Sequence, residues 1–270
     1  MDVYFEDVHH TYPSGVHAVR GVTLHVPAGQ RLAIVGQNGA GKTTLVRHLN
    51  GIFRPSRGTV RVGDWTTSDK DIADLAARVG YVFQNPDEQL FARKVIDDVT
   101  FGPRNLGFDA ERSAQAVREA LSATGLTEHA QDHPYHLALS ERKRVALASV
   151  LAMQTQVVVL DEPTTGQDER GVQMIARIVG DLAAQGRTVV AITHDMDFCA
   201  ENFDRVVVMA DGQVRADDVP ERAFRQAEAL ADAQVEPPQL LRLADELGWD
   251  SSPLTVPAFV DGLAARRAVR

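Results

Sequence analysis

The amino-acid sequence predicts an α/β fold built on a mostly parallel β-sheet. Short apolar runs at residues 31–35, 157–160 and 189–192 contain the valine and isoleucine that are typical of buried strands. Each run is followed within two residues by glycine, acidic or histidine residues. Because ligands bind at the carboxyl ends of parallel strands, these residues are expected to share one edge of the sheet.

Composition excludes several classes of protein. The 270 residues carry a formal net charge of −9, whereas a dedicated nucleic-acid binder needs a basic surface, so no nucleic-acid partner is expected. No stretch reaches the roughly 18 apolar residues of a membrane span, and the N-terminus does not resemble a signal peptide, so we expect a soluble chain. The single cysteine, Cys199, cannot form an internal disulfide and is expected to pack within a helix.

A glycine-rich loop follows the first of these strands. Residues 36–43 read GQNGAGKT, which satisfies the pattern G-x-x-x-x-G-K-[ST], and residues 42–49 have the apolar spacing of a helix. Small residues let consecutive backbone N–H groups point at phosphate oxygens, Lys42 supplies a charge to the β and γ phosphates, and the Thr43 hydroxyl ligates Mg²⁺. The residues expected to bind ATP here are Gly36, Asn38, Gly39, Ala40, Gly41, Lys42, Thr43 and Thr44.

The second and third strands end in groups that suit hydrolysis. Asp161 and Glu162 follow residues 157–160, and we assign Asp161 to the metal and Glu162 to the role of general base. An alternative is that these adjacent acids only cap the next helix. His194 stands just beyond residues 189–192, and its position at the same sheet edge favours a catalytic role.

Together these residues resemble the nucleotide-binding subunits of ABC transporters. Gln84 in "VGYVFQNPDEQLF" is similar to that family's Q-loop glutamine, which senses the metal, and Asp168 in "GQD" is similar to its D-loop. Tyr12 is placed like the aromatic residue that stacks on adenine. The resemblance implies a RecA-type P-loop NTPase core, an N-terminal antiparallel β subdomain, an inserted helical subdomain at about residues 85–153, and a small C-terminal helical appendage.

A closer resemblance is to the ATPases of energy-coupling-factor importers, which take up vitamins, cobalt or nickel. It is carried by "FQNPDEQLFARKVIDDVTFGPRNLG" and by the tail "EPPQLLRLADELGWDSSPLTVPAFVDGL". Arg104 departs from the acidic residue expected in that family's "FGPEN". The resemblance implies a second ATPase subunit, an integral membrane scaffold, a separate substrate-binding membrane subunit, and a peripheral location on the cytoplasmic face of the membrane. It places the nucleotide-binding domain at residues 1–217 and a helical extension, with a possible role in dimerisation, at 218–270.

The segment that resembles the family's LSGGQ signature is altered. Without gaps, Ala138 replaces its serine, Leu139 and Ser140 replace its glycines, and Glu141 replaces its glutamine. A gapped alignment instead places Leu139 and Ser140 on the family's Leu-Ser and deletes both glycines. In the ungapped version the lost hydroxyl donor weakens this half-site by about 1.5–3 kcal/mol, which favours a heterodimer with an intact partner over a homodimer.

Two other functions use the same phosphate loop. A soluble ATP-dependent switch with a non-membrane partner has the same nucleotide chemistry and remains an alternative. A small-molecule kinase is disfavoured, because "LDEP" and "THD" suit activation of water. The acidic pair Asp87 and Glu88, which follows Gln84, is a candidate contact for basic residues of a membrane subunit.

Overall fold

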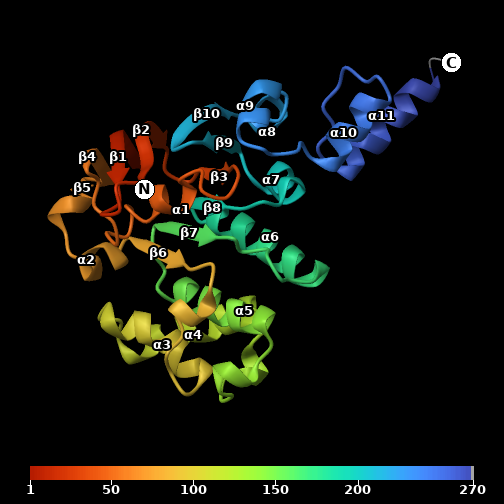
Figure 1. Cartoon of the computed structure of the whole chain (residues 1–270). Coiled ribbons are helices and arrows are strands. Elements are labelled where there is room, and N and C mark those ends of the chain that lie inside the picture. Colours follow the sequence, from red (N-terminus) through yellow and green to blue (C-terminus); the bar gives the residue numbers. More distant parts are fainter. Residues whose placement is uncertain (269–270) are drawn as a thin grey trace.

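The computed structural model describes residues 1–268, which form two β-sheets with helices around them (Figure 1). The N-terminal sheet is antiparallel and has the strand order β2-β1-β4-β5. Its strands are β1 (Val3–Thr11), β2 (His17–Val26), β4 (Arg57–Val62) and β5 (Trp65–Thr66).

The second sheet has the order β10-β9-β3-β8-β7-β6 and is parallel except for its edge strand β10. Its strands are β3 (Arg31–Val35), β6 (Val79–Val82), β7 (Val157–Asp161), β8 (Thr188–Ile192), β9 (Arg205–Ala210) and β10 (Gln213–Asp218). All residues of β7 and β8 are buried, as expected for strands covered on both faces. The predicted α/β fold class is confirmed.

Helices cover the parallel sheet, and one of them is shorter than predicted. They are α1 (Lys42–Val46), α2 (Ile72–Ala76), α6 (Glu169–Ala184) and α7 (Met196–Asn202). The prediction of a helix over residues 42–49 is wrong at its end, because α1 stops at Val46. Beyond Val46, the His48 ring nitrogen and the His48 backbone N–H both contact the Leu45 carbonyl. The Leu49 N–H donates to the Val46 carbonyl, three residues back, and not to the Leu45 carbonyl as in an α-helix. The chain therefore continues as tight turns.

The helices between β6 and β7 form a separate layer at the bottom of Figure 1. They are α3 (Val95–Asn105), α4 (Ala110–Ala123) and α5 (Leu139–Ala152), joined by the single turns η2 (Pro86–Glu88), η3 (Thr127–His129) and η4 (Pro134–His136); a further turn, η1 (Thr67–Asp69), precedes α2. Within residues 1–268, no helix combines the length and apolar character needed to cross a membrane.

The C-terminal extension divides into two parts. It contains α8 (Pro220–Ala223), α9 (Ala227–Asp232), α10 (Gln239–Glu246) and α11 (Val256–Ala268). Phe224, Leu230 and Ala233 belong to the same buried cluster as the parallel sheet. Trp249, in the loop after α10, and Phe259, in α11, instead stack on each other in a small cluster of their own. Figure 1 shows α10 and α11 at its far right. Leu241 of α10 and Leu254 also belong to the main cluster, so both parts of the extension contact the main core.

Phe224→Ala tests whether the extension stabilises that core. Phe224 is 1% exposed, so we expect its truncation to lower the free energy of unfolding by about 3–5 kcal/mol through the lost burial and the cavity left behind. Leu247→Ala is the control, since Leu247 is 52% exposed and its loss should change stability by less than about 0.5 kcal/mol. Denaturant unfolding of both variants measures the difference, and equal midpoints would contradict the shared core.

Candidate functional site

The loop between β3 and α1 depends on glycines at two points of close approach. Gly36 has φ 146° and Gly41 has φ 96°, values that favour glycine. A Cβ atom on Gly36 would lie 2.1 Å from the Met209 carbonyl oxygen, and one on Gly41 would lie 2.2 Å from the Ala18 carbonyl oxygen. The loop backbone is therefore pressed against β9 and β2, which holds its N–H groups in place.

This arrangement leaves donors free for an anion. Within residues 1–268, the backbone N–H groups of Asn38, Gly39 and Gly41 make no hydrogen bond. The Lys42 ammonium is folded over the same loop, donating to the carbonyls of Gly36 at 2.5 Å and Gln37 at 2.9 Å. Burial lowers the pKa of Lys42, while the Glu162 and Asp161 carboxylates oppose this effect. Unpaired N–H groups beside a buried ammonium form a site for phosphate.

A cavity of about 410 Å³ collects the predicted nucleotide residues. Gln84, which lies just after β6, and His194, which lies just after β8, line it together with the glycine-rich loop. Its lining includes Tyr12, Asn38, Gly39, Ala40, Gly41, Lys42, Thr43, Thr44, Gln84, Asp161, Glu162 and His194. Of the residues predicted to bind ATP, only Gly36 does not line this cavity, because it lies at the base of the loop.

Tyr12 is fixed on the wall of this cavity. Its hydroxyl lies 2.8 Å from the Thr44 hydroxyl, and its ring packs edge-on against His10 at 4.8 Å between centroids. The ring is only partly buried, so it can still offer an aromatic face to a planar ligand.

Asp161 ends β7 opposite the loop, and its two oxygens have different partners. Thr43 Oγ1 lies 3.4 Å from Asp161 Oδ1, and the Tyr81 hydroxyl donates to Asp161 Oδ2 at 2.8 Å. Burial raises the pKa of Asp161, while the Tyr81 hydrogen bond opposes this. A hydroxyl and a carboxylate oxygen are hard ligands, so this pair fits Mg²⁺. Tyr81 lies on the edge strand β6, and its role as a partner of Asp161 is not predicted from the sequence, because the two residues are far apart along the chain.

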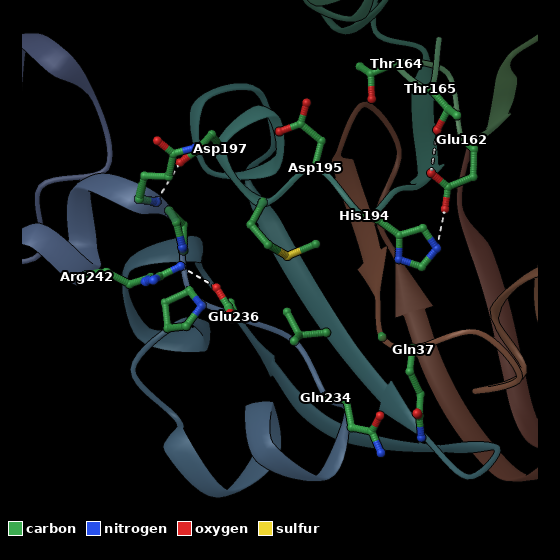
Figure 2. A pocket seen from close by; sticks show the side chains of 16 residues that line it. Gln37, Glu162, Thr164, Thr165, His194, Asp195, Asp197, Gln234, Glu236 and Arg242 are labelled. Carbon is green, nitrogen blue, oxygen red and sulfur yellow. Dashed lines mark hydrogen bonds and ion pairs between the residues drawn. The ribbon is translucent and has the colours of Figure 1, made fainter.

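Glu162 follows Asp161 in a strained conformation. Its φ is 52°, in the left-handed region that is uncommon for residues other than glycine, and its side chain is 5% exposed. Its Oε1 lies 2.9 Å from His194 Nε2, and its Oε2 accepts from the Thr165 hydroxyl at 3.3 Å. Figure 2 shows this His194–Glu162 contact at the rim of a second cavity.

Burial sets the charge state of this pair. It raises the pKa of Glu162 above the usual 4.5, against the effect of the Lys42 charge. Burial also lowers the pKa of His194, and the Lys42 charge lowers it further. His194 is therefore neutral at neutral pH and can donate Nε2–H to the carboxylate.

The signature-like segment lies outside both cavities. Ala138 caps the N-terminus of α5, and its backbone N–H donates to the Glu141 carboxylate at 2.9 Å. Ala138 and Leu139 are exposed, and Ser140 is partly buried. The helix begins at Leu139. None of these four residues lines the 410 Å³ cavity, so the structure does not bring them to the chain's own phosphate loop.

Asp168 also lies apart from that cavity. Its side chain caps α6 by accepting from the Gly171 N–H at 2.8 Å, and it lies 3.7 Å from Arg144. Within the chain itself, Asp168 therefore caps the N-terminus of α6.

The acidic pair after Gln84 has partners within the chain. Asp87 bonds Arg142 of α5 at 2.8 Å, and Glu88 lies 3.5 Å from Arg47. Gln89, the next residue, accepts from the Phe83 N–H and donates to the Ala146 carbonyl. The segment that follows Gln84 is therefore attached both to the end of α1 and to the helix that carries the signature-like residues.

Comparisons with known proteins agree with this geometry. Residues 19–165 match the ABC transporter family. The chain belongs to this family. It is 40% identical over 244 residues to the energy-coupling factor transporter ATP-binding protein EcfA of Methanocaldococcus jannaschii, covering 90% of this chain and 88% of that protein. It is 41% identical over 242 residues to EcfA of Methanoculleus marisnigri, covering 89% and 87%. The predicted resemblance to ATP-binding subunits of the energy-coupling-factor class is confirmed.

Solved structures of this ABC transporter family have the same fold. The chain matches cbiO1 of Clostridium perfringens, part of the ABC transporter complex cbiONQ, with a TM-score of 0.75 and 33% identity over 91% of this chain and 98% of that one. It also matches a dimeric ATP-binding cassette bound to ADP and phosphate, with a TM-score of 0.75 and 25% identity over 81% and 98% of the two chains. This ABC protein is therefore an ATPase.

A pair of glycine variants tests the loop geometry. Gly41→Ala places a Cβ against the Ala18 carbonyl and forces the backbone to move, so we expect ATP affinity to fall by about 100-fold. In Gly39→Ala the added Cβ meets no atom within 4 Å. This variant suffers only the backbone strain of a left-handed residue at φ 85°, about 1–2 kcal/mol, so its ATP affinity should fall less than that of Gly41→Ala. Calorimetric titration with ATP compares the two, and equal losses would contradict a close-approach role for Gly41.

Proposed function

We propose that this ABC ATPase energises a membrane importer of the energy-coupling-factor type, for a vitamin or a transition metal. The observation that carries the proposal is one cavity in which the phosphate loop, Gln84, the acids after β7 and His194 meet. The names of the relatives support the class of transporter. The protein then acts at the cytoplasmic face of the membrane, peripherally bound to an integral scaffold subunit, while a separate membrane subunit binds the solute.

Each group in the cavity has a task in hydrolysis. The free N–H groups of the loop and Lys42 hold the phosphates, and Tyr12 stacks on the adenine. Thr43 and Asp161 would hold Mg²⁺, and Gln84, which lines the same cavity, would contribute to that site. When bound, the metal neutralises charge on the phosphate oxygens.

Glu162 and His194 handle the attacking water. The Glu162 carboxylate accepts a proton from water, and its burial excludes bulk solvent from that step. Neutral His194 exchanges its contact with Glu162 for one with the γ-phosphate. The left-handed backbone of Glu162 aims its side chain at the cavity, which supports a functional reason for the strain.

A second ATPase subunit completes the site in this proposal. The signature-like residues lie away from the chain's own phosphate loop, which suits contact with nucleotide held by a partner. Because Ala138 lacks a hydroxyl and its N–H is used by Glu141, a homodimer contains two weakened sites. A heterodimer with an intact signature contains one fully competent site, and we favour that assembly.

An apolar groove supports docking of the membrane scaffold. A cavity of about 260 Å³ between α2, β6 and α3 is lined by apolar side chains, among them Ile72, Phe91 and Phe101. These three residues are at least half exposed, and such a patch is typical of a protein contact site. The groove also contains Gln89, whose side chain accepts from the backbone N–H of Phe83, the residue before Gln84, and donates to Ala146 of α5.

Purification from membranes tests this assignment. Tagged protein extracted in mild detergent is expected to carry along a second ATPase and an integral membrane subunit, identified by mass spectrometry. Phe91→Ser together with Phe101→Ser is expected to release the membrane subunit while leaving ATP binding intact. Recovery of only non-membrane partners supports the alternative of a soluble ATP-dependent switch.

Glu162→Gln tests the general base. We expect kcat of the assembled complex to fall by about 10²–10⁴-fold while ATP binding remains, since the amide cannot accept the proton. In the wild type, kcat should decline as pH falls through the raised pKa of Glu162, because the carboxylate form is lost there. Glu111→Gln, at an exposed acid on α4, is the matched control. Normal turnover of the Glu162→Gln complex would exclude Glu162 as the base.

Ala138→Ser tests the ungapped signature assignment. A restored hydroxyl is expected to raise turnover of the complex by about 10-fold, the effect of one hydrogen bond to a charged oxygen. Ala138→Val adds volume without a donor and should not raise it. Unchanged turnover in both variants would favour the gapped alignment.

A further inference from the structure

Two loops of the nucleotide site are tied to one short stretch of the C-terminal extension, residues 233–239. The backbone N–H of Gln37, in the phosphate loop, donates to the Ala233 carbonyl at 2.9 Å. The backbone N–H of Gln239, at the start of α10, donates to Asp197 Oδ1 at 2.9 Å. Asp197 lies in the first turn of α7, close behind His194.

The first tie comes from the way α9 ends. Gln234 adopts a left-handed conformation with φ 50°, and the Val235 N–H returns to the Leu230 carbonyl. This turn leaves the carbonyl of fully buried Ala233 directed at the phosphate loop. The Gln37 N–H is thereby satisfied, whereas its neighbours in the loop remain free to bind phosphate.

The second tie positions the loop that carries His194. Asp195 caps α7 by accepting from the Phe198 N–H at 2.9 Å, which leaves Asp197 available to α10. A carboxylate at the N-terminus of α10 also meets the positive end of that helix. Movement of α10 therefore pulls on the turn that follows His194.

A cavity of about 630 Å³ lies between the two ties. In Figure 2 its wall includes Gln37 and Gln234 at one end, and Asp197 and Arg242 at another. Glu162 and His194 line both this cavity and the 410 Å³ one, so the two spaces meet at the catalytic groups. Residues 233–239 thus form a wall next to the position proposed for the γ-phosphate.

We propose that residues 233–239 are a strap that fixes the distance between the phosphate loop and the His194 loop. Gln234 and Asp197 are its positioning residues: Gln234 sets the turn that reaches Gln37, and Asp197 anchors α10. Displacement of α10 and α11 would then change nucleotide affinity and turnover without any direct contact with ATP. This inference rests on the proposed function of the cavity, and it assigns regulation of that site to the C-terminal extension.

Variants of Asp197 separate the strap from a simple effect on α7. Asp197→Ala removes the acceptor for Gln239, and we expect kcat of the complex to fall by about fivefold, the effect of one hydrogen bond. KM for ATP should change little, because the tie to Gln37 remains. Asp197→Asn keeps an acceptor oxygen and should restore most of kcat.

Glu201 provides a control on α7, the helix that carries Asp197. Glu201→Ala alters an exposed acid one turn further along α7 and should leave kcat unchanged. If Asp197→Asn is as slow as Asp197→Ala, the hydrogen bond from Gln239 does not position the His194 loop and the strap is wrong at this end.

Variants of Gln234 test the other tie. Glycine accepts a left-handed conformation, so Gln234→Gly should keep the turn, whereas the β-branched side chain in Gln234→Val should break it. In the full-length Gln234→Val variant without nucleotide, we expect the Gln37 amide hydrogen to exchange at least about fivefold faster than in the wild type. This factor corresponds to the loss of one hydrogen bond. Its KM for ATP should rise by a similar factor while the glycine variant matches the wild type.

Hydrogen exchange distinguishes failure of the strap from failure of the proposed function. Equal exchange at Gln37 in the wild type and both Gln234 variants would overturn the strap, whatever the ATPase rates. If exchange changes as expected but the wild-type complex transports no solute, the importer assignment fails and the strap stands.

Discussion

Close contact between the phosphate loop and the strands beside it is the constraint on which the site depends. At Gly36 and Gly41 the loop backbone lies so near the carbonyls of Met209 and Ala18 that no side chain fits. This contact fixes where the free N–H groups point, and Lys42 is held over the same loop. Asp161, Glu162 and His194 can act on a phosphate only because β3, β7 and β8 run parallel and end at one edge.

That common edge explains which parts of the site could be predicted. Val157–Asp161 and Thr188–Ile192 are continuous apolar strands, so the positions of Asp161 and His194 follow from strand order and local pattern. The end of α1 could not be predicted from apolar spacing, because it depends on the His48 ring competing for a backbone carbonyl. The Tyr81–Asp161 bond and the tie between Gln37 and Ala233 join residues far apart in the sequence, and no local signal specifies them.

The phosphate loop and the signature-like segment are held in place in different ways. The phosphate loop is held by buried backbone contacts, whereas Ala138 and Leu139 lie exposed at the start of α5. Glu141 satisfies the Ala138 N–H, so the helix start is stable without the hydroxyl that a serine would supply. The altered signature is therefore compatible with a well-formed helix, and its cost falls on the contact with a partner's nucleotide.

The internal ion pairs of Asp87 and Glu88 bear on how a membrane subunit can dock. Both acids already have an arginine close by, Arg142 and Arg47, so an incoming cation has to displace one of them. Such an exchange trades one exposed ion pair for another and contributes little net binding energy. Displacement of Arg142 from Asp87 would, however, leave Arg142 free on α5, the helix that begins with the signature-like residues. Binding of a partner at the surface around Asp87 would therefore alter the charge near the signature-like segment.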